Sequence, residues 1–555
     1  LSRDMAEEYT LNKARAFCAV QQHSTRHAKF QRLTVKEMAK FSAMVATASN
    51  KVPNPAADPA NIFEALGSEN TQEWMAALVE EEESLDSLGV FLHNQSKAQL
   101  RKLGITDKFI IPSRYVVTTK RHPDRTIDRL KVRRVIQGHK YAMKRGIHYD
   151  ESFTPSPTQD TTRIMQAMAI GHGLLPFAFD ITCAHQQAPT TGPKLAIKYP
   201  KGFEHFDPNT GEELYAVLQT NLNGKPDGSR QWGTFRDKWI LDTFNSNGYQ
   251  CTQSTRDPCL FSVTDETGAR THMICFTDDM DCYTESMPSM LKIADLFRAR
   301  FGIKVVDPKF MLGVVRQRYE RDGVMYCHMH QAEYIAELHS TFSCHFSPRS
   351  RSHELPFPKG ARLYVGCEDC TPEEIETTRS KGYLRLCGAL LWVARNTMPG
   401  ISFAVNQLCK MMSCPTPGAF QLALHTLQWA CDNRHTGIVF RSNGKPQPTV
   451  FYDASFNPDP NDGKSNYGFS SHLYGGPVSW TSKKLAHVGT HVGMNETMAQ
   501  CFGAKQGTWV YYLLKELRIS PTELVDLYGD NDQATRLGQE PMMTVSNKCY
   551  LPQCY

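Results

Sequence analysis

Two adjacent acids at a predicted hairpin constrain this chain more than any other feature of its sequence. Asp278 and Asp279 follow the apolar run 272–276, whose composition and neighbouring turn residues predict a β-strand. Two like charges this close repel each other, and a bound cation relieves the repulsion. A third acid, Asp180, ends another predicted strand at 177–180. Because strands distant in sequence can pair in one sheet, the three carboxylates can meet at one edge.

Three carboxylates at one sheet edge are typical of sites that bind Mg²⁺, since this ion prefers oxygen ligands. Two such ions about 3.5–4 Å apart can assist the attack of a 3′-hydroxyl on a nucleoside triphosphate. An Asp-Asp pair is also common in solvated turns, so the pair alone leaves both a metal site and a solvated turn open. The next acid, Asp281, is expected to be a solvated strand residue rather than a ligand.

The length and composition of the chain narrow the class of protein. A chain of 555 residues is too long for one hydrophobic core and is expected to fold as several domains. No apolar run is long enough to span a bilayer and no signal peptide is recognisable, so we expect neither a membrane protein nor a secreted one. The 17 scattered cysteines favour reduced thiols in the cytoplasm or nucleus. The net charge of +5 permits nucleic-acid binding without demonstrating it.

Two segments in the first third of the chain combine charge with a regular pattern. Apolar residues at helical spacing predict a helix over 73–88, with the acidic face 80–83 in solvent. The segment 109–148 is strand-like and basic. Such a segment is either a solvated hairpin or a surface that follows a nucleic-acid backbone, because Lys and Arg gain affinity by releasing counterions.

Two stretches without regular patterning predict domain boundaries. The proline-rich stretch 51–59 predicts an extended linker, because proline restricts the backbone to extended conformations. The stretch 345–375 is rich in Ser, Pro and Gly and predicts a second linker. Helices are expected over 376–435, and strands resume at 449–453.

A series of short motifs resembles one known family. In chain order the motifs are KVRRVIQG (131–138), GIHYDESFTP (146–155), FDITCA (179–184), PKGFE (200–204), LNGKPDGSRQW (222–232), DPCLF (257–261), FTDD (276–279), FMLG (310–313) and QAEYI (331–335). In this order and spacing they resemble the reverse transcriptase–RNase H region of copia-type LTR-retrotransposon Pol polyproteins. The resemblance covers 62–342 and continues more weakly toward 540.

The resemblance implies an α+β right-hand polymerase of fingers, palm and thumb, followed by a connecting helical segment and an α/β RNase H-like domain. It divides the chain into an N-terminal linker or extension (1–60), the reverse transcriptase fingers, palm and thumb (61–345), a linker and connection segment (346–445) and the RNase H-like domain (446–555). The implied activity is RNA-directed DNA polymerisation by two-metal nucleotidyl transfer, with two Mg²⁺ or Mn²⁺ ions in each active site.

Matching the motifs position by position implies roles for individual residues. Asp180, Asp278 and Asp279 carry over as the catalytic, metal-binding acids of the polymerase. Four residues fall in segments that should approach the incoming nucleotide or the template-primer: Arg133, Arg134, Gln231 and Trp232.

Two positions near these acids depart from the family pattern. Phe276-Thr277 replaces the family's Tyr-Val and leaves the acids in place. His185 stands where the family has an aromatic residue that packs under the sugar and excludes the 2′-hydroxyl. The smaller, polar imidazole predicts weaker selection against ribonucleotides. Ratios of rNTP to dNTP incorporation that are equal in the wild type and in His185→Phe would contradict this hypothesis.

The C-terminal segment carries a second set of acids. Asp453 and Asp530 end predicted strands and Glu496 lies on a predicted helix, which is the layout of the metal-binding, catalytic acids of an RNase H fold. The family's fourth acid should fall near Leu551, where the sequence has no carboxylate. We therefore expect cleavage of RNA–DNA hybrids to be reduced or absent, because one electrostatic group is worth roughly 10²–10³ in rate.

The expected partners follow from the same resemblance. They are an RNA template, a DNA or RNA primer, RNA–DNA hybrids and dNTPs, with integrase and capsid proteins of the same element and no membrane. The expected location is a cytoplasmic virus-like particle or the nucleus. The alternative is a decayed or domesticated copy that binds nucleic acid without catalysis. The three polymerase acids favour the active enzyme, whereas His185 and Leu551 favour the alternative.

Overall fold

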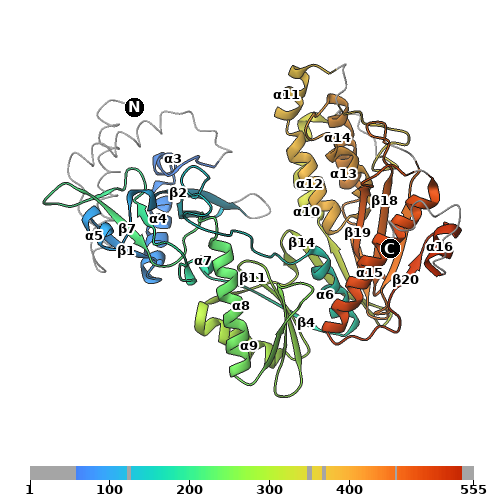
Figure 1. Cartoon of the computed structure of the whole chain (residues 1–555), viewed down its shortest axis with the longest axis horizontal. Coiled ribbons are helices and arrows are strands. Elements are labelled where there is room, and N and C mark those ends of the chain that lie inside the picture. Colours follow the sequence, from blue (N-terminus) through green and yellow to red (C-terminus); the bar gives the residue numbers. More distant parts are fainter. Residues whose placement is uncertain are drawn as a thin grey trace. The chain divides into compact units, whose positions relative to one another are not determined.

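The structure, a computed structural model, describes residues 58–121, 127–346, 353–365, 370–456, 459–489 and 491–539. The described residues form a mixed α/β protein with several sheets (Figure 1). Most of the predicted extension 1–60, and Leu551 with its missing acid, lie outside the described residues. Among the helices that the structure describes, none is long and apolar enough to cross a membrane.

The chain divides into two compact units. Unit 1 comprises Leu1–Pro155 and Ile181–Thr243, and unit 2 comprises Ser156–Asp180 and Phe244–Tyr555. This division follows the packing of the chain, and the predicted division into four segments stays a prediction.

Unit 1 is built on a sheet with the strand order β1-β7-β5-β2-β3, to which β6 adds by pairing with β7. The strands are β1 (Phe91–Gln95), β2 (Ile110–Arg121), β3 (Ile127–Ile136), β5 (Ala196–Lys198), β6 (His205–Phe206) and β7 (Glu213–Leu218). The helices are α3 (Ile62–Gly67), α4 (Thr71–Ser87), α5 (Lys97–Lys102), η2 (Asp107–Phe109), α7 (Ala184–Gln187) and most of α8 (Gly228–Ser246).

The long hairpin β2–β3 is amphipathic, because successive side chains of a strand point to opposite faces. Its inward residues Tyr115, Val117 and Val132 are buried in one cluster with Trp74 and Leu78 of α4. The helix predicted over 73–88 and the strand-like character of the basic segment are therefore confirmed.

Two glycines of the family-like motifs allow close backbone contact inside unit 1. A Cβ atom on Gly138 would lie 2.1 Å from the Gly224 carbonyl oxygen, and one on Gly224 would lie 2.3 Å from the Ile136 oxygen. Gly224 also has φ +88°, which disfavours other residues. The approach is completed by a hydrogen bond of 2.8 Å from Ile136 N–H to the Asn223 carbonyl oxygen.

Unit 2 contains three sheets with the orders β12-β4-β11-β10-β9-β8, β13-β14-β15-β16 and β19-β18-β17-β20. The strands of the first are β4 (Leu175–Ile181), β8 (Gln250–Gln253), β9 (Leu260–Thr264), β10 (Arg270–Cys275), β11 (Asp279–Thr284) and β12 (Ile303–Val306). Those of the second are β13 (Phe310–Met311), β14 (Val314–Arg321), β15 (Val324–His330) and β16 (Ile438–Arg441). Those of the third are β17 (Thr449–Ala454), β18 (Asn466–Leu473), β19 (Gly476–Lys484) and β20 (Asp526–Tyr528).

The helices of unit 2 confirm the predicted helical stretch 376–435. They are α6 (Gln159–Gly171), α9 (Met287–Phe301), α10 (Ala332–Thr341), η3 (Ser343–His345), α11 (Pro372–Ser380), α12 (Tyr383–Asn396), η4 (Pro399–Ile401), α13 (Ser402–Cys409), α14 (Pro417–Asp432), α15 (Val492–Glu516) and α16 (Asp532–Gln539).

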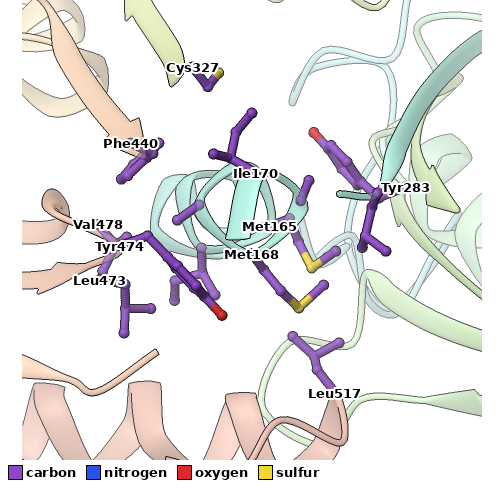
Figure 2. Close-up of a cluster of buried hydrophobic side chains, with 14 of the residues drawn as sticks. Met165, Met168, Ile170, Tyr283, Cys327, Phe440, Leu473, Tyr474, Val478 and Leu517 are labelled. Carbon is purple, nitrogen blue, oxygen red and sulfur yellow. The ribbon is translucent and has the colours of Figure 1, made fainter. Parts of the chain in front are cut away.

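Helix α6 lies at the centre of the core of unit 2. All its residues from Thr161 to Ile170 are buried, as expected for a helix that is covered on every side. Figure 2 shows this helix end-on, with Tyr283 of β11 on one side and Phe440 of β16 and Val478 of β19 on the other. The three sheets of unit 2 therefore share one hydrophobic core.

Candidate functional site: two carboxylate clusters

The first carboxylate cluster forms where β4 and β11 pair. In this antiparallel pair Asp279 stands directly opposite Asp180, next to Phe179 opposite Met280. Phe179 and Met280 are fully buried, and their burial fixes the register because a slip of one residue would turn them outward. Asp278 lies in the preceding turn, which is closed by a 2.9 Å hydrogen bond from Phe276 N–H to the Asp279 carbonyl oxygen. The backbone register thus sets Asp279 beside Asp180, with Asp278 one residue before. Among the described residues these three acids do not form a group whose ligand oxygens all lie within 4.8 Å of one another, so a shared metal site there stays a prediction.

The electrostatics of this cluster favour a bound cation. Burial and the negative charges of Asp278 and Asp180 together raise the pKa of Asp279 to about 6. A raised pKa marks a carboxylate whose negative charge is poorly compensated, and a divalent cation bound to its oxygens would compensate that charge. The oxygen ligands of these acids suit Mg²⁺ or Mn²⁺ in chemical type. Among the described residues, however, only Asp453, Glu496 and Asp530 bring three ligand oxygens within 4.8 Å of one another.

A buried ion pair lies beneath this cluster, on the same face of β11. Asp281 is completely buried, with its carboxylate 2.8 Å from the Arg316 guanidinium. The Tyr283 hydroxyl donates a 2.7 Å hydrogen bond to the same carboxylate. The expectation that Asp281 is solvated was wrong, because the alternation of β11 places it inward and β14 supplies the countercharge.

The second carboxylate cluster lies in the sheet β19-β18-β17-β20. Asp453 is in β17, Asp530 follows β20, and Glu496 lies on α15. One ligand oxygen from each of the three lies within 4.8 Å of the others. The parallel register of Phe451 with Tyr528 explains the meeting, since Asp453 and Asp530 each follow two residues later.

The surroundings of Glu496 indicate whether a cation fits the second carboxylate cluster. Its side chain is 3% exposed, and Oε1 accepts a hydrogen bond of 3.2 Å from Ala454 N–H. Oε2 is buried and has no hydrogen-bond partner among the described residues. Burial raises the pKa of Glu496, the Ala454 N–H opposes this, and the charges of Asp453 and Asp530 add to it, so that the pKa is about 7. A buried oxygen without a donor, facing two other carboxylates, fits Mg²⁺.

Arg133 and Arg134 do not share a surface. Arg133 is exposed on the outward face of β3. Arg134 is completely buried, 3.1 Å from the Glu82 carboxylate and with its guanidinium carbon 4.4 Å from the Phe91 ring centre. The prediction that Arg134 approaches nucleic acid was therefore wrong, because its position in β3 points it into the core of unit 1.

The same ion pair corrects the predicted acidic face of α4. Glu82 is buried and also accepts a 2.8 Å hydrogen bond from the Tyr115 hydroxyl. Glu81 accepts one of 2.9 Å from Arg134 N–H, and burial raises its pKa to about 6. Two of the four acids thus serve the packing of α4 on β3. The strict alternation from buried Val132 to Arg134 was the sequence signal that could have found this pair.

Gln231 and Trp232 also contribute to the interior of unit 1. Trp232 is completely buried in α8. The Gln231 amide donates hydrogen bonds to Asp227 Oδ2 at 2.5 Å and to the Thr191 carbonyl oxygen at 3.3 Å. The complete burial of Trp232 contradicts direct nucleotide or template contact by that side chain. For Gln231, which is bonded to Asp227 and Thr191, the predicted contact stays a prediction.

His185 lies in α7 and is half-buried against the start of α8. A Cβ atom on Gly228 would come within 3.3 Å of His185 Nδ1. His185 belongs to unit 1, whereas both carboxylate clusters belong to unit 2. Its role in selecting the sugar stays a prediction.

No protein-family model matches the chain. A retrovirus-related Pol polyprotein from transposon RE1 of Arabidopsis thaliana is 26% identical over 436 residues, which are 78% of this chain and 28% of that protein. The corresponding polyprotein from transposon RE2 of the same plant is 24% identical over 439 residues, again 78% of this chain and 28% of that protein. A transposon Ty5-1 protein of Saccharomyces cerevisiae is 31% identical over 106 residues, which are 19% of this chain and 34% of that protein.

These relatives indicate a retroelement protein. More particularly, the chain is similar to retrovirus-related Pol polyproteins of copia-type transposons, the resemblance that its motifs predicted. It spans 28% of the length of the two plant relatives, so the activities of a whole Pol polyprotein are proposals here.

Proposed function

We propose that the chain copies RNA into DNA at the cluster of Asp180, Asp278 and Asp279, as an RNA-directed DNA polymerase. The observation that carries the proposal is the register of β4 and β11, which sets Asp279 opposite Asp180 with Asp278 in the adjoining turn. A solvated turn would not require an acid of a distant strand to stand opposite Asp279. In this proposal the first sheet of unit 2 is the palm and unit 1 contributes the fingers.

The three acids would hold the metal ions and place them at the sheet edge. Bound Mg²⁺ lowers the pKa of the attacking hydroxyl and offsets the charge of the phosphoryl group. The buried residues Phe179 and Met280 keep the two strands in register, so that the carboxylates stay in place while substrates exchange. Asp281, already neutralised by Arg316, would not compete for the metal.

A basic face of unit 1 supports contact with a nucleic-acid backbone. The register of β2 with β3 places the outward cations on one face of the hairpin: Arg114, Lys120, Arg129, Lys131 and Arg133. Burial lowers the pKa of Lys131, and the charges of Arg133 and Arg129 lower it further. Cations that repel each other in the free protein are stabilised when phosphates lie between them.

We further propose that Asp453, Glu496 and Asp530 cleave the RNA strand of the hybrid product. In this proposal the sheet β19-β18-β17-β20 with α15 is an RNase H-like domain. The unpartnered Oε2 of Glu496 supports a metal there. Because the fourth acid is missing near Leu551, we expect a lower rate than in an enzyme with four acids. A wild-type rate of cleavage on a labelled RNA–DNA hybrid, comparable to that of a four-acid enzyme, would contradict this expectation.

Primer extension on poly(rA)/oligo(dT) with Mg²⁺ or Mn²⁺ tests the polymerase proposal. We expect extension by the wild type and its loss in Asp278→Asn, which keeps the size of the side chain and removes its charge. Asp307→Asn, an exposed aspartate of unit 2, is the matched control and should extend normally. Hybrid binding without any extension by the wild type would instead favour the decayed copy that binds nucleic acid without catalysis.

A further inference from the structure

The sheet β13-β14-β15-β16 presents two different faces. One face packs against α6 through Val314, Cys327, Met329 and Phe440, which are all buried in the shared core. Because side chains alternate along each strand, the neighbouring residues point to the opposite face. At the centre of that face Tyr319 of β14 pairs with Tyr326 of β15, which pairs in turn with Arg441 of β16.

The two tyrosines form a stacked pair on this face. Their ring centres are 5.2 Å apart and their planes differ by 10°. Tyr319 is 39% exposed, so one of the two stacked rings offers much of its surface to solvent. A tyrosine ring that is stacked on one face offers its other face to a further planar ring, because offset stacking of aromatic rings is favourable.

The outward strand positions of this face carry two arginines, Arg321 and Arg441. The positions that point outward on the three longer strands contain no carboxylate: Val315, Gln317, Tyr319, Arg321, Val324, Tyr326, His328, His330, Val439 and Arg441. Arg441 is exposed and forms no ion pair with a carboxylate of the described residues. Arg321, at the tip of the hairpin, is 3.5 Å from Asp322 of the turn. Arg441 is therefore the cation best placed beside the tyrosines.

We propose that this tyrosine face, defined by Tyr319, Tyr326 and Arg441, binds single-stranded nucleic acid. Unpaired bases would stack on the exposed Tyr319 ring, and Arg441 would contact a phosphate. Stacking on aromatic residues accepts any base and requires that the bases be free, so a duplex fits this face poorly. The inference rests on the proposed function in one respect, namely that unpaired template or product strands are present. The face belongs to the same compact unit as both carboxylate clusters.

The test is the binding of the full chain to a fluorescent oligo(dT) strand and to a blunt RNA–DNA hybrid, measured by anisotropy. Stacking is worth about 1–3 kcal/mol for each base, so Tyr319→Ala should weaken single-strand binding by roughly 5-fold to 150-fold. Tyr319→Phe keeps the ring and should bind like the wild type. Tyr364→Ala removes a tyrosine that is 53% exposed elsewhere in the chain and should also bind like the wild type. Affinity for the blunt hybrid should not change in any of these variants.

Salt dependence separates the roles of the two side chains. The slope of log affinity against log salt should fall by roughly 0.7 in Arg441→Gln, because one phosphate contact is lost. It should stay at the wild-type value in Tyr319→Ala, since stacking releases no counterions. Equal slopes in Arg441→Gln and the wild type would overturn the role of Arg441.

Two results would overturn the proposal as a whole. One is unchanged single-strand affinity in Tyr319→Ala that is folded by circular dichroism. The other is a wild-type dimer that Tyr319→Ala dissociates without any loss of binding, which would make the face a contact between copies. Asp278→Asn distinguishes this proposal from the polymerase proposal, since it should abolish extension and leave single-strand binding intact. If the wild type fails to extend primers and Tyr319→Ala still weakens binding, only the polymerase proposal fails.

Discussion

Arg133 and Arg134 are neighbours in sequence, yet they lie in different environments because β3 turns successive side chains to opposite faces. Arg133 reaches solvent on the basic face. Arg134 is enclosed by Glu82 and by the rings of Phe91 and Tyr199, whose centres are 4.4 Å and 5.0 Å from its guanidinium carbon. At the scale of the residue, the outward direction of Arg133 leaves it available for binding, whereas the inward direction of Arg134 gives it a structural role.

Arg134→Ala should lower the free energy of unfolding by about 3–5 kcal/mol, because it leaves the buried Glu82 carboxylate without a countercharge. Arg133→Ala should change it by less than about 0.5 kcal/mol and should weaken nucleic-acid binding instead. Urea unfolding followed by circular dichroism measures both values. Equal destabilisation by the two variants would contradict the assignment.

The pKa of Glu496 predicts how stability responds to pH when metal is removed. Its pKa is raised from 4.5 to about 7 in the folded protein, so folding favours the protonated acid. This contribution is fully present below 4.5 and is lost as the pH rises through 7. In EDTA the melting temperature should therefore fall between about pH 5 and pH 8, and Mg²⁺ should restore it at the higher pH. In Glu496→Gln the melting temperature should fall less over this pH range, because the titrating carboxyl is gone. A melting temperature that falls as much as in the wild type would exclude Glu496 as the cause.

At the scale of elements, Asp459 joins the connecting helices to the last sheet. Its side chain is 3% exposed, with Oδ2 at 2.6 Å from the Lys410 ammonium after α13 and 3.3 Å from that of Lys484 in β19. Asn461, two residues later, donates a 3.0 Å hydrogen bond to the Leu363 carbonyl oxygen. The loop that begins at Asp459 thus holds three separate segments together.

Asp459→Asn should destabilise the protein by about 1–3 kcal/mol at neutral pH, since it removes two charge-assisted hydrogen bonds. Burial opposes ionisation of Asp459, but hydrogen bonds from Lys410 and Asn461 outweigh it and hold the pKa below the usual 3.8. A lowered pKa stabilises the folded state above 3.8, and the effect diminishes as the pH falls below that value. The difference in unfolding free energy should therefore shrink at about pH 3. Asp462→Asn, whose side chain is 36% exposed, is the control and should have a smaller effect.

At the scale of the whole molecule, α6 connects the two carboxylate clusters through shared packing. Arg163 of this helix is buried and donates hydrogen bonds to the carbonyl oxygens of Val478 at 2.7 Å and Arg395 at 2.6 Å. Its guanidinium lies 4.0 Å from the centre of the Trp480 ring. The helix that packs beneath Tyr283 of β11 therefore also completes the core of the C-terminal sheet (Figure 2).

Residues 446–555 produced alone should consequently lack a stable core, because Leu473, Tyr474 and Val478 lose the surface of α6. We expect them to bind a hydrophobic dye and to unfold without a sharp transition. The full chain should show a cooperative unfolding transition. Met168→Ala should lower its free energy of unfolding by about 2–5 kcal/mol, because it removes a buried side chain from the core. A sharp, dye-free transition of the isolated segment would show that the last sheet folds independently.

Several elements could be predicted from the sequence because their signals are local. The helix at 73–88, the strand before Asp278, the helices of 376–435 and the turn that contains Asp278 all follow from periodicity and turn chemistry. The order of the motifs also indicated the similarity to retrovirus-related Pol polyproteins that the relatives show. These features depend on residues that are close together in the chain.

The partners of buried charges could not be predicted in the same way. Asp281 with Arg316, and Glu82 with Arg134, are joined across strands and helices that the sequence pattern does not align.

The sequence by itself determined which residues are acidic, where strands end and which family the chain resembles. Only the tertiary structure decided that Asp180 faces Asp279, that α6 serves three sheets, and that Tyr319 and Tyr326 share an exposed face. The physical reason is that strand register and burial depend on contacts between distant segments. The same residue type can form a buried ion pair or reach solvent, according to the face of the strand to which it points.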